Sequence, residues 1–229
     1  MSKLKSLVTL MSLASVTAMA SDVITIEDIP KIKSVRDSVI SPSGDHIAFT
    51  RTLPRELYVD KNGASYSGLY ITDTKGNARP FITGKVNVGA LEWSADGKFV
   101  YFLAKFKGEK FTQLYRIPVD GGEREKVLAL KDTSISRYDI SPDGKQVALL
   151  AMPAKDKSDK KLKELGFQAE VYEMDLKNKQ LFITDLAVQA KALSLTPVDI
   201  SGYVSDMNWA ADNAQLLVKT QPTALIDDS

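Results

Sequence analysis

The chain has 229 residues, of which 44% are hydrophobic and 26% are charged, a composition typical of globular proteins and not of disordered ones. It contains no cysteine, which excludes disulfides, thiolate metal sites and a cysteine nucleophile. Its 30 basic and 29 acidic residues leave no excess of positive charge for binding nucleic acid.

The first 20 residues have the features of an export signal. Lys3 and Lys5 give a positive start, an apolar run follows from Leu7 to Val16, and residues 18–20 form an A-x-A cleavage site. The run is too short to span a bilayer, which takes about 20 apolar residues. We therefore expect a signal peptide over 1–20 that is cleaved after Ala20, export to a periplasm, and no membrane attachment of the mature chain.

A motif of 11 residues then recurs along the chain. An apolar residue leads into Ser-Pro-Asp-Gly or a variant of it, and an apolar strand follows. The copies are ISPSGDHIAFT from Ile40, WSADGKFVYFL from Trp93, ISPDGKQVALL from Ile140 and, less faithfully, WAADNAQLLVK from Trp209. The intervals between them are 53, 47 and 69 residues. Periods of about 40 to 50 residues are typical of repeat architectures.

Each unit carries further predicted strands. A strand with a tyrosine follows each of the first three motifs: GLYITD with Tyr70, QLYRIP with Tyr115 and EVYEMD with Tyr172. A second turn and a last strand come next, with the sequences RPFIT, EKVLAL and QLFIT. Four antiparallel strands per unit form the blade of a β-propeller. The sequence thus predicts an all-β fold, a partial β-propeller of about three and a half four-stranded blades.

The predicted organisation places a lead-in segment at 21–34 and the partial propeller at 35–229. The units of the propeller span about 35–84, 86–130, 133–186 and 202–229.

The long third interval contains a highly charged insertion at 155–167, KDKSDKKLKELGF, between the second and third strands of the third unit. Its leucines predict a short helix with one apolar edge, which ends at Gly166. The insertion is either a solvated loop that docks on its own blade or an element that faces a partner.

The repeated turns explain the constant residues of the motif. Glycine supplies a positive φ without steric cost. Proline presets φ at the start of the turn, and aspartate can hydrogen-bond its own backbone there. Gly108 matches no repeat turn, so we expect it to tolerate substitution better than Gly144. The candidate structural residues of the turns are Ser41, Pro42, Gly44, Ser94, Asp96, Gly97, Ser141, Pro142, Asp143 and Gly144.

Trp93 and Trp209 stand directly before two of the turns. An aromatic side chain there either stacks on a ligand in a central channel or packs between neighbouring blades. We favour packing between blades, since large aromatic side chains are mostly buried.

These residues resemble a known family. The repeat, S-P-D-G-x-x-[VI]-A with a tyrosine strand after it, is similar to that in the N-terminal propellers of prolyl oligopeptidase-family serine peptidases, and also to that in the Tol-system periplasmic propeller. The lead-in at 24–51, the segment KLKELGFQAEVYEMDL at 161–176 and the ending KTQPTALIDDS at 219–229 resemble the acylaminoacyl-peptidase and dipeptidyl-peptidase-like branch. The resemblance implies a propeller of about seven or eight blades and a chain truncated before the catalytic α/β-hydrolase domain.

The catalytic serine of that family lies in a G-x-S-x-G elbow, and an aspartate and a histidine complete its triad. The sequence has no such elbow, and its nearest segment, GASYSG at 63–68, has Ser67 in place of the last glycine. The single histidine, His46, stands at a strand position that holds Phe99 and Gln146 in other units, so a role as catalytic base is not indicated. We predict no catalytic residue, no metal, no cofactor and no activity of the chain alone.

The favoured function is that of a non-catalytic, substrate-gating propeller fragment of an exported serine peptidase that acts on peptides. Peptides are then partners only within a full-length enzyme. The alternative is a periplasmic propeller module that binds a protein partner, similar to the Tol-system propeller. The uncovered ends of a partial propeller also predict self-association.

Overall fold

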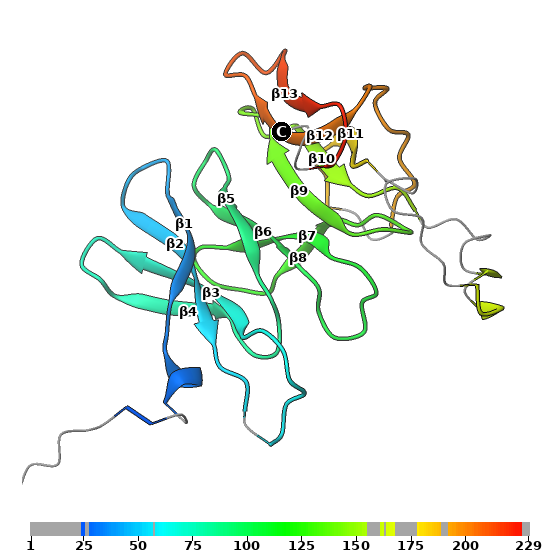
Figure 1. Ribbon diagram of the computed structural model, residues 1–229. Helices are drawn as coiled ribbons and strands as arrows, with labels where there is room; N and C mark the ends of the chain where they lie inside the picture. The colour runs from blue at the N-terminus through cyan, green and yellow to red at the C-terminus, as the bar shows by residue number, and fades with distance from the viewer. Residues whose placement is uncertain are drawn as a thin grey trace, which may run out of the picture.

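The computed structural model describes residues 24–25, 28–56, 58–154, 161–162, 164–167, 178–188 and 192–225. They form four antiparallel sheets that follow one another along the chain (Figure 1). A short 3-10 helix, η1 (Ile29–Lys31), precedes the first sheet.

The first two sheets have four strands each, paired in chain order. They contain β1 (Val35–Ile40), β2 (His46–Leu53), β3 (Tyr66–Asp73) and β4 (Ala78–Ile82), then β5 (Gly89–Trp93), β6 (Phe99–Ala104), β7 (Gln113–Pro118) and β8 (Glu125–Leu128). The third sheet contains β9 (Ile135–Ile140), β10 (Gln146–Ala151) and β11 (Gln180–Asp185), and the fourth contains β12 (Tyr203–Trp209) and β13 (Leu216–Gln221). The fold is a partial β-propeller, as the repeat predicts, and each sheet is called a blade below.

The core lies between the blades. Alternate side chains of a strand point to opposite faces of its sheet, so each inner blade is apolar on both faces. In β6, Val100 and Phe102 pack against the first blade, whereas Tyr101 and Leu103 pack against the third. A smaller cluster joins the third blade to the fourth, with Leu150 on one side and Met207 on the other.

The repeat turns have the same backbone geometry in all four blades. The first turn residue, Ser41, Ser94, Ser141 or Ala210, donates its N–H to the carbonyl five residues later, and its own carbonyl accepts the N–H of the residue three positions on. That fourth turn residue has a positive φ in each case: 80° at Gly44, 70° at Gly97, 70° at Gly144 and 60° at Asn213. Asparagine tolerates the left-handed region better than most residues, so it replaces glycine in the last turn.

The third blade differs from the expected strand order. QLFIT, predicted as a last strand, forms β11 and pairs directly with β10, with Leu149 opposite Phe182. Phe49 and Phe102 lie opposite Tyr70 and Tyr115 in the same way in the first two blades. The predicted tyrosine strand EVYEMD lies outside the described residues. The Val198 N–H donates to the Leu181 carbonyl on the far side of β11, at 2.7 Å.

Gly166 and Gly108, which lie outside the repeat turns, both have a positive φ. Gly166 has a φ of +89° and follows one helical turn at Lys161, as the insertion predicts. The apolar edge of that turn is exposed, including Leu165 and Phe167. Gly108 also has a φ of +89°, as strained for an L side chain as the +70° of Gly144, so the backbone gives no support to the expectation that Gly108 tolerates substitution better than Gly144.

Candidate functional site

The first strands of the blades, β1, β5, β9 and β12, carry contacts that link one blade to the next. Two positions recur in these contacts. The pre-turn residues, directly before each repeat turn, are Ile40, Trp93, Ile140 and Trp209. The acceptor residues, one position earlier, are Val39, Glu92, Asp139 and Asn208.

Trp93 joins the second blade to the first. Its indole N–H donates to the Val39 carbonyl at 3.0 Å. Its ring is only 9% exposed and packs in a cluster with side chains of both blades, among them Ala48 and Leu91. The tryptophan therefore belongs to the core between blades, which is the favoured interpretation of the sequence.

Each boundary between neighbouring blades is called a joint below. At the next two joints the side-chain carboxylate of the acceptor residue receives the hydrogen bond. The Ile140 N–H donates to Glu92 Oε1 at 3.2 Å, and the Trp209 N–H donates to Asp139 Oδ2 at 2.5 Å. The Trp209 indole N–H also donates to the Asp139 carbonyl, at 3.1 Å. In every joint an acceptor residue of one blade thus receives a hydrogen bond from the pre-turn residue of the next.

Ala90 in β5 touches the blades on both sides. Its N–H donates to Asp37 Oδ2 at 3.0 Å, and its carbonyl accepts the Tyr138 hydroxyl at 2.7 Å. Its φ is +52°, an uncommon value for alanine, and the register of β5 against β6 shifts at this point between Gly89 and Glu92. The shift turns both peptide groups of Ala90 toward neighbouring blades.

Burial changes the pKa values of the acidic residues between the blades. Burial, with a smaller contribution from the charge of Asp139, raises the pKa of Glu92 to about 8. Burial also raises the pKa of Asp139. Arg137 Nη2 and Asp206 Oδ1 form an ion pair at 2.7 Å between β9 and β12, with both side chains about half exposed. Sequence patterns did not single out Glu92 or Asp139, although both stand two residues before a turn serine.

The predicted turn residues hold the hairpins in shape. The hydroxyl oxygens of Ser41, Ser94 and Ser141 each accept the N–H of the residue five positions later, at 2.9 to 3.0 Å. Ser94 and Ser141 also donate to the aspartates two residues on, both at 2.7 Å, which lowers the pKa of Asp96 and of Asp143. In the last turn, where alanine replaces serine, Asp212 accepts the equivalent N–H of Gln215 at 3.2 Å. Pro42 and Pro142 stand at the second position of their turns.

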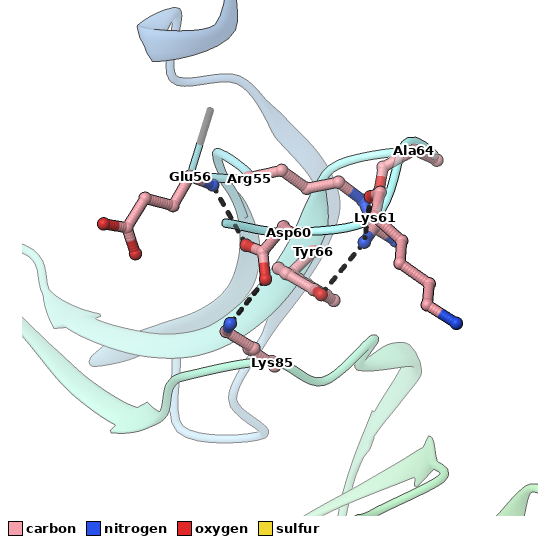
Figure 2. Close-up of polar contacts among 7 residues, drawn as sticks. All are labelled: Arg55, Glu56, Asp60, Lys61, Ala64, Tyr66 and Lys85. Carbon is pink, nitrogen blue, oxygen red and sulfur yellow. Dashed lines mark hydrogen bonds and ion pairs between the residues drawn. The ribbon is translucent and has the colours of Figure 1, made fainter. Parts of the chain in front are cut away.

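The loop between β2 and β3 is held by Arg55 (Figure 2). The guanidinium donates to the Ala64 carbonyl at 2.7 Å, to the Lys61 carbonyl at 3.0 Å and to the Tyr66 hydroxyl at 3.0 Å. It also lies over the Tyr66 ring, 4.4 Å from the ring centre. All these acceptors belong to the loop or to the first residue of β3, so Arg55 fixes the path of the chain.

Asp60 ties the same loop to the segment before β5. It accepts the Glu56 N–H at 3.0 Å and forms an ion pair with Lys85 (Figure 2). The Asp60 side chain is 7% exposed, whereas that of Lys85 is 60% exposed. The hydrogen bond from Lys85 holds the pKa of Asp60 below its usual value, and the same bond raises the pKa of Lys85. These charges stabilise the loop.

Ser67 of the GASYSG segment does not meet the histidine. Ser67 is 8% exposed, and its hydroxyl donates to the Val88 carbonyl at 2.7 Å. Ser67 pairs with Thr52 in the first sheet, whereas His46 pairs with Asp73, six residues further along β3. Six residues of strand span roughly 20 Å. Ser67 and His46 therefore cannot exchange a proton, and the role that the segment plays is structural.

In the described ranges, no three His, Asp or Glu side chains lie close enough together to hold a metal ion. No helix among those residues has the length and apolar character to cross a membrane.

No family model matches the chain, and no curated protein matches it. Solved structures do. Acylaminoacyl peptidase in complex with Z-Gly-Gly-Phe-chloromethyl ketone is similar with a TM-score of 0.59 and 15% identity, over 84% of this chain and 29% of that one. A structure from a study of two prolyl endopeptidases has a TM-score of 0.50 and 20% identity, over 81% of this chain and 26% of that one.

The chain thus has the fold of a portion of these peptidases and spans less than a third of their length. TolB from Acinetobacter baumannii has a TM-score of 0.41 and 19% identity, over 73% of this chain and 33% of that one. That likeness is too weak to favour a function. At these identities the comparisons establish the propeller fold.

Proposed function

We propose that the chain is the non-catalytic propeller portion of an exported peptidase, and that it admits peptides to a catalytic domain while excluding folded proteins. One observation carries the proposal. The likeness to acylaminoacyl peptidase extends over 84% of this chain but only 29% of that enzyme, so it concerns a part of an enzyme. The sequence supports a non-catalytic role for this part, because it has one histidine and no G-x-S-x-G elbow.

The joints between blades support a gating role. A propeller that excludes substrates by size must keep its blades packed together when a large substrate contacts it. Hydrogen bonds from Trp93, Ile140 and Trp209 tie each first strand to the previous blade, and the donors are at least half-buried. Buried hydrogen bonds that would lose their partners are costly to break.

The test is active-site labelling of the product of the natural gene, read through codon 229. A fluorophosphonate probe reacts with activated serines, and mass spectrometry then locates the labelled peptide. We expect the label outside residues 1–229 and no label on the chain expressed alone. Labelling of a serine within 1–229, or a product without any reactive serine, would overturn the proposal.

Gating is tested on the same product with one cleavage sequence in two forms. The sequence is offered as a short peptide and as an exposed loop of a stably folded protein. We expect the peptide to be cleaved and the folded substrate to be spared. A protein partner captured by a product that lacks peptidase activity would instead favour the periplasmic binding module.

A further inference from the structure

A cleft of about 520 Å³ lies between the first and second blades. Phe81 and Ile82 of β4 line it from the first blade, and Tyr115 and Ile117 of β7 line it from the second. Both blades are four-stranded sheets, so the cleft lies inside the described propeller and not at one of its ends. Its volume is within the range of about 300–1,000 Å³ that is usual for small-molecule sites.

Two of the charged groups that line the cleft neutralise each other. Lys126 Nζ lies 2.5 Å from Glu109 Oε1, which also accepts the Tyr115 hydroxyl. Glu109 Oε2 accepts the Phe106 N–H at 2.9 Å. Burial alone would raise the pKa of Glu109, but the bonds from Lys126 and Tyr115 keep that pKa below its usual value, so the carboxylate is charged at neutral pH. Both of its oxygens already have donors, and it therefore needs no ligand.

The guanidinium of Arg124 also lines the cleft, but nothing neutralises it. It lies over the Phe106 ring, 3.8 Å from the ring centre, and Phe106 in turn packs edge-on against Tyr115 with the ring centres 4.9 Å apart. Among the residues that the structure describes, Arg124 has no carboxylate partner and no hydrogen-bond acceptor. A stacked guanidinium with free N–H donors beside an apolar surface is suited to bidentate binding of a carboxylate.

We propose that the cleft binds a small monocarboxylate with an aromatic or branched apolar body. Arg124 holds the carboxylate, and the apolar body packs against Phe81 and Ile117. Glu109 and the exposed Glu123 also line the cleft, and their negative charges oppose a second charge on the ligand, so a single carboxylate is favoured over a phosphate. The argument uses contacts within the propeller and does not depend on the peptidase proposal.

The test is a titration of the full, ¹⁵N-labelled chain with three ligands, followed by two-dimensional NMR. N-acetylphenylalanine has both the carboxylate and the apolar body, N-acetylphenylalaninamide lacks the charge, and N-acetylglycine lacks the apolar body. We expect N-acetylphenylalanine to bind with a dissociation constant in the millimolar range or below and to shift the backbone signals of Gly122 and Arg124. The other two ligands should bind at least about tenfold more weakly.

Arg124→Gln removes the charge and should weaken the binding of N-acetylphenylalanine at least about tenfold. The Arg124 side chain is exposed, so the variant should stay folded, which a thermal melt checks. Arg36→Gln is the matched control, because Arg36 is also exposed but lies in β1 and does not line the cleft. It should bind N-acetylphenylalanine as the wild type does.

Three results would each overturn the proposal. The first is that N-acetylphenylalanine does not bind. The second is that N-acetylphenylalaninamide or N-acetylglycine binds as tightly as N-acetylphenylalanine. The third is that a folded Arg124→Gln variant binds N-acetylphenylalanine as tightly as the wild type. The comparison of ligands on the wild-type chain decides the question even if the variant does not fold.

Discussion

Trp209 and Asp139 share two hydrogen bonds across a blade boundary: the Trp209 N–H donates to Asp139 Oδ2, and the indole N–H donates to the Asp139 carbonyl. The two residues are 70 positions apart in the chain. Trp93 makes the second of these bonds with Val39. The indole N–H of a tryptophan therefore donates across two of the blade boundaries. Replacing tryptophan by phenylalanine removes this donor with little change in the shape of the side chain.

We expect Trp209→Phe to lower the free energy of unfolding by about 0.5–1.5 kcal/mol beyond the loss of ring area, because the indole hydrogen bond is lost. Trp93→Phe should show a similar loss, since its bond to Val39 is equivalent. Urea denaturation followed by circular dichroism measures both. Val59→Ala is the control, and its effect should stay within about 0.5 kcal/mol because the side chain is exposed. Stability unchanged in both phenylalanine variants would contradict the role of the indole.

Glu92 makes stability depend on pH. Its pKa is about 8 in the folded chain and has the ordinary value of 4.5 as reference when the chain is unfolded, so the folded state holds the proton more tightly. The free energy of unfolding should therefore fall as pH rises from about 5 to 8, by at most about 1.4 kcal/mol per pH unit for one proton. Below pH 4.5 the group is protonated in both states and adds no dependence.

Glu92→Gln is the matching variant, because glutamine resembles the protonated acid and keeps an oxygen for the Ile140 N–H. Its stability should vary less between pH 5 and pH 8 than that of the wild type, and it should exceed the wild type at pH 8. Asp45→Asn changes an exposed acid and serves as control. Parallel pH profiles for wild type and Glu92→Gln would show that Glu92 is not the group responsible.

A substitution at Gly144, in the third repeat turn, measures the cost of backbone strain without a steric clash. A Cβ at Gly144 meets no atom within 4 Å, so Gly144→Ala should cost only the left-handed conformation, roughly 1–2 kcal/mol. Gly89→Ala is the comparison, because Gly89 lacks a positive φ and its Cβ would lie 3.6 Å from Asp37 Oδ2, an ordinary contact. Thermal melts of the two variants measure the difference. Equal losses would mean that the strain at 144 is relieved elsewhere.

Substitution of Asp60 should loosen the loop between β2 and β3 more than substitution of Lys85. Asp60→Ala removes both the ion pair with Lys85 and the hydrogen bond from the Glu56 N–H, whereas Lys85→Ala removes only the ion pair. We expect limited proteolysis within residues 54–65 to accelerate several-fold in Asp60→Ala and less in Lys85→Ala. If cleavage is equally fast in both variants, the backbone hydrogen bond contributes nothing to the order of the loop.

The repeat turns could be predicted because they are local. The backbone bonds of the turn at Ser141 and the bond to its hydroxyl join residues at most five positions apart, so the motif itself specifies this geometry. A further bond, from the Asp143 N–H to Asn213 Oδ1, reaches a residue 70 positions away. The fourth, divergent turn follows the same rule with Asn213 in place of glycine.

The third blade shows where local pattern fails. Both EVYEMD and QLFIT have the letters of a strand, and residues 152–179 separate β10 from β11, so nothing near either segment selects the partner of β10. One signal was present: QLFITD is identical at four of six positions to GLYITD, in the third strand of the first blade. The register of Phe182 against Leu149 is the register that this match predicts.

The sequence by itself determined the repeat, the propeller fold, the absence of cysteine and the single histidine, because each is written in the order or the number of the residues. Only the tertiary structure decided which residues join the blades. Glu92 meets Ile140 across 48 positions and Trp93 meets Val39 across 54, and such distances depend on how whole sheets pack. Burial between sheets also raises the pKa of Glu92, because desolvation acts on a side chain only after distant parts of the chain have closed over it.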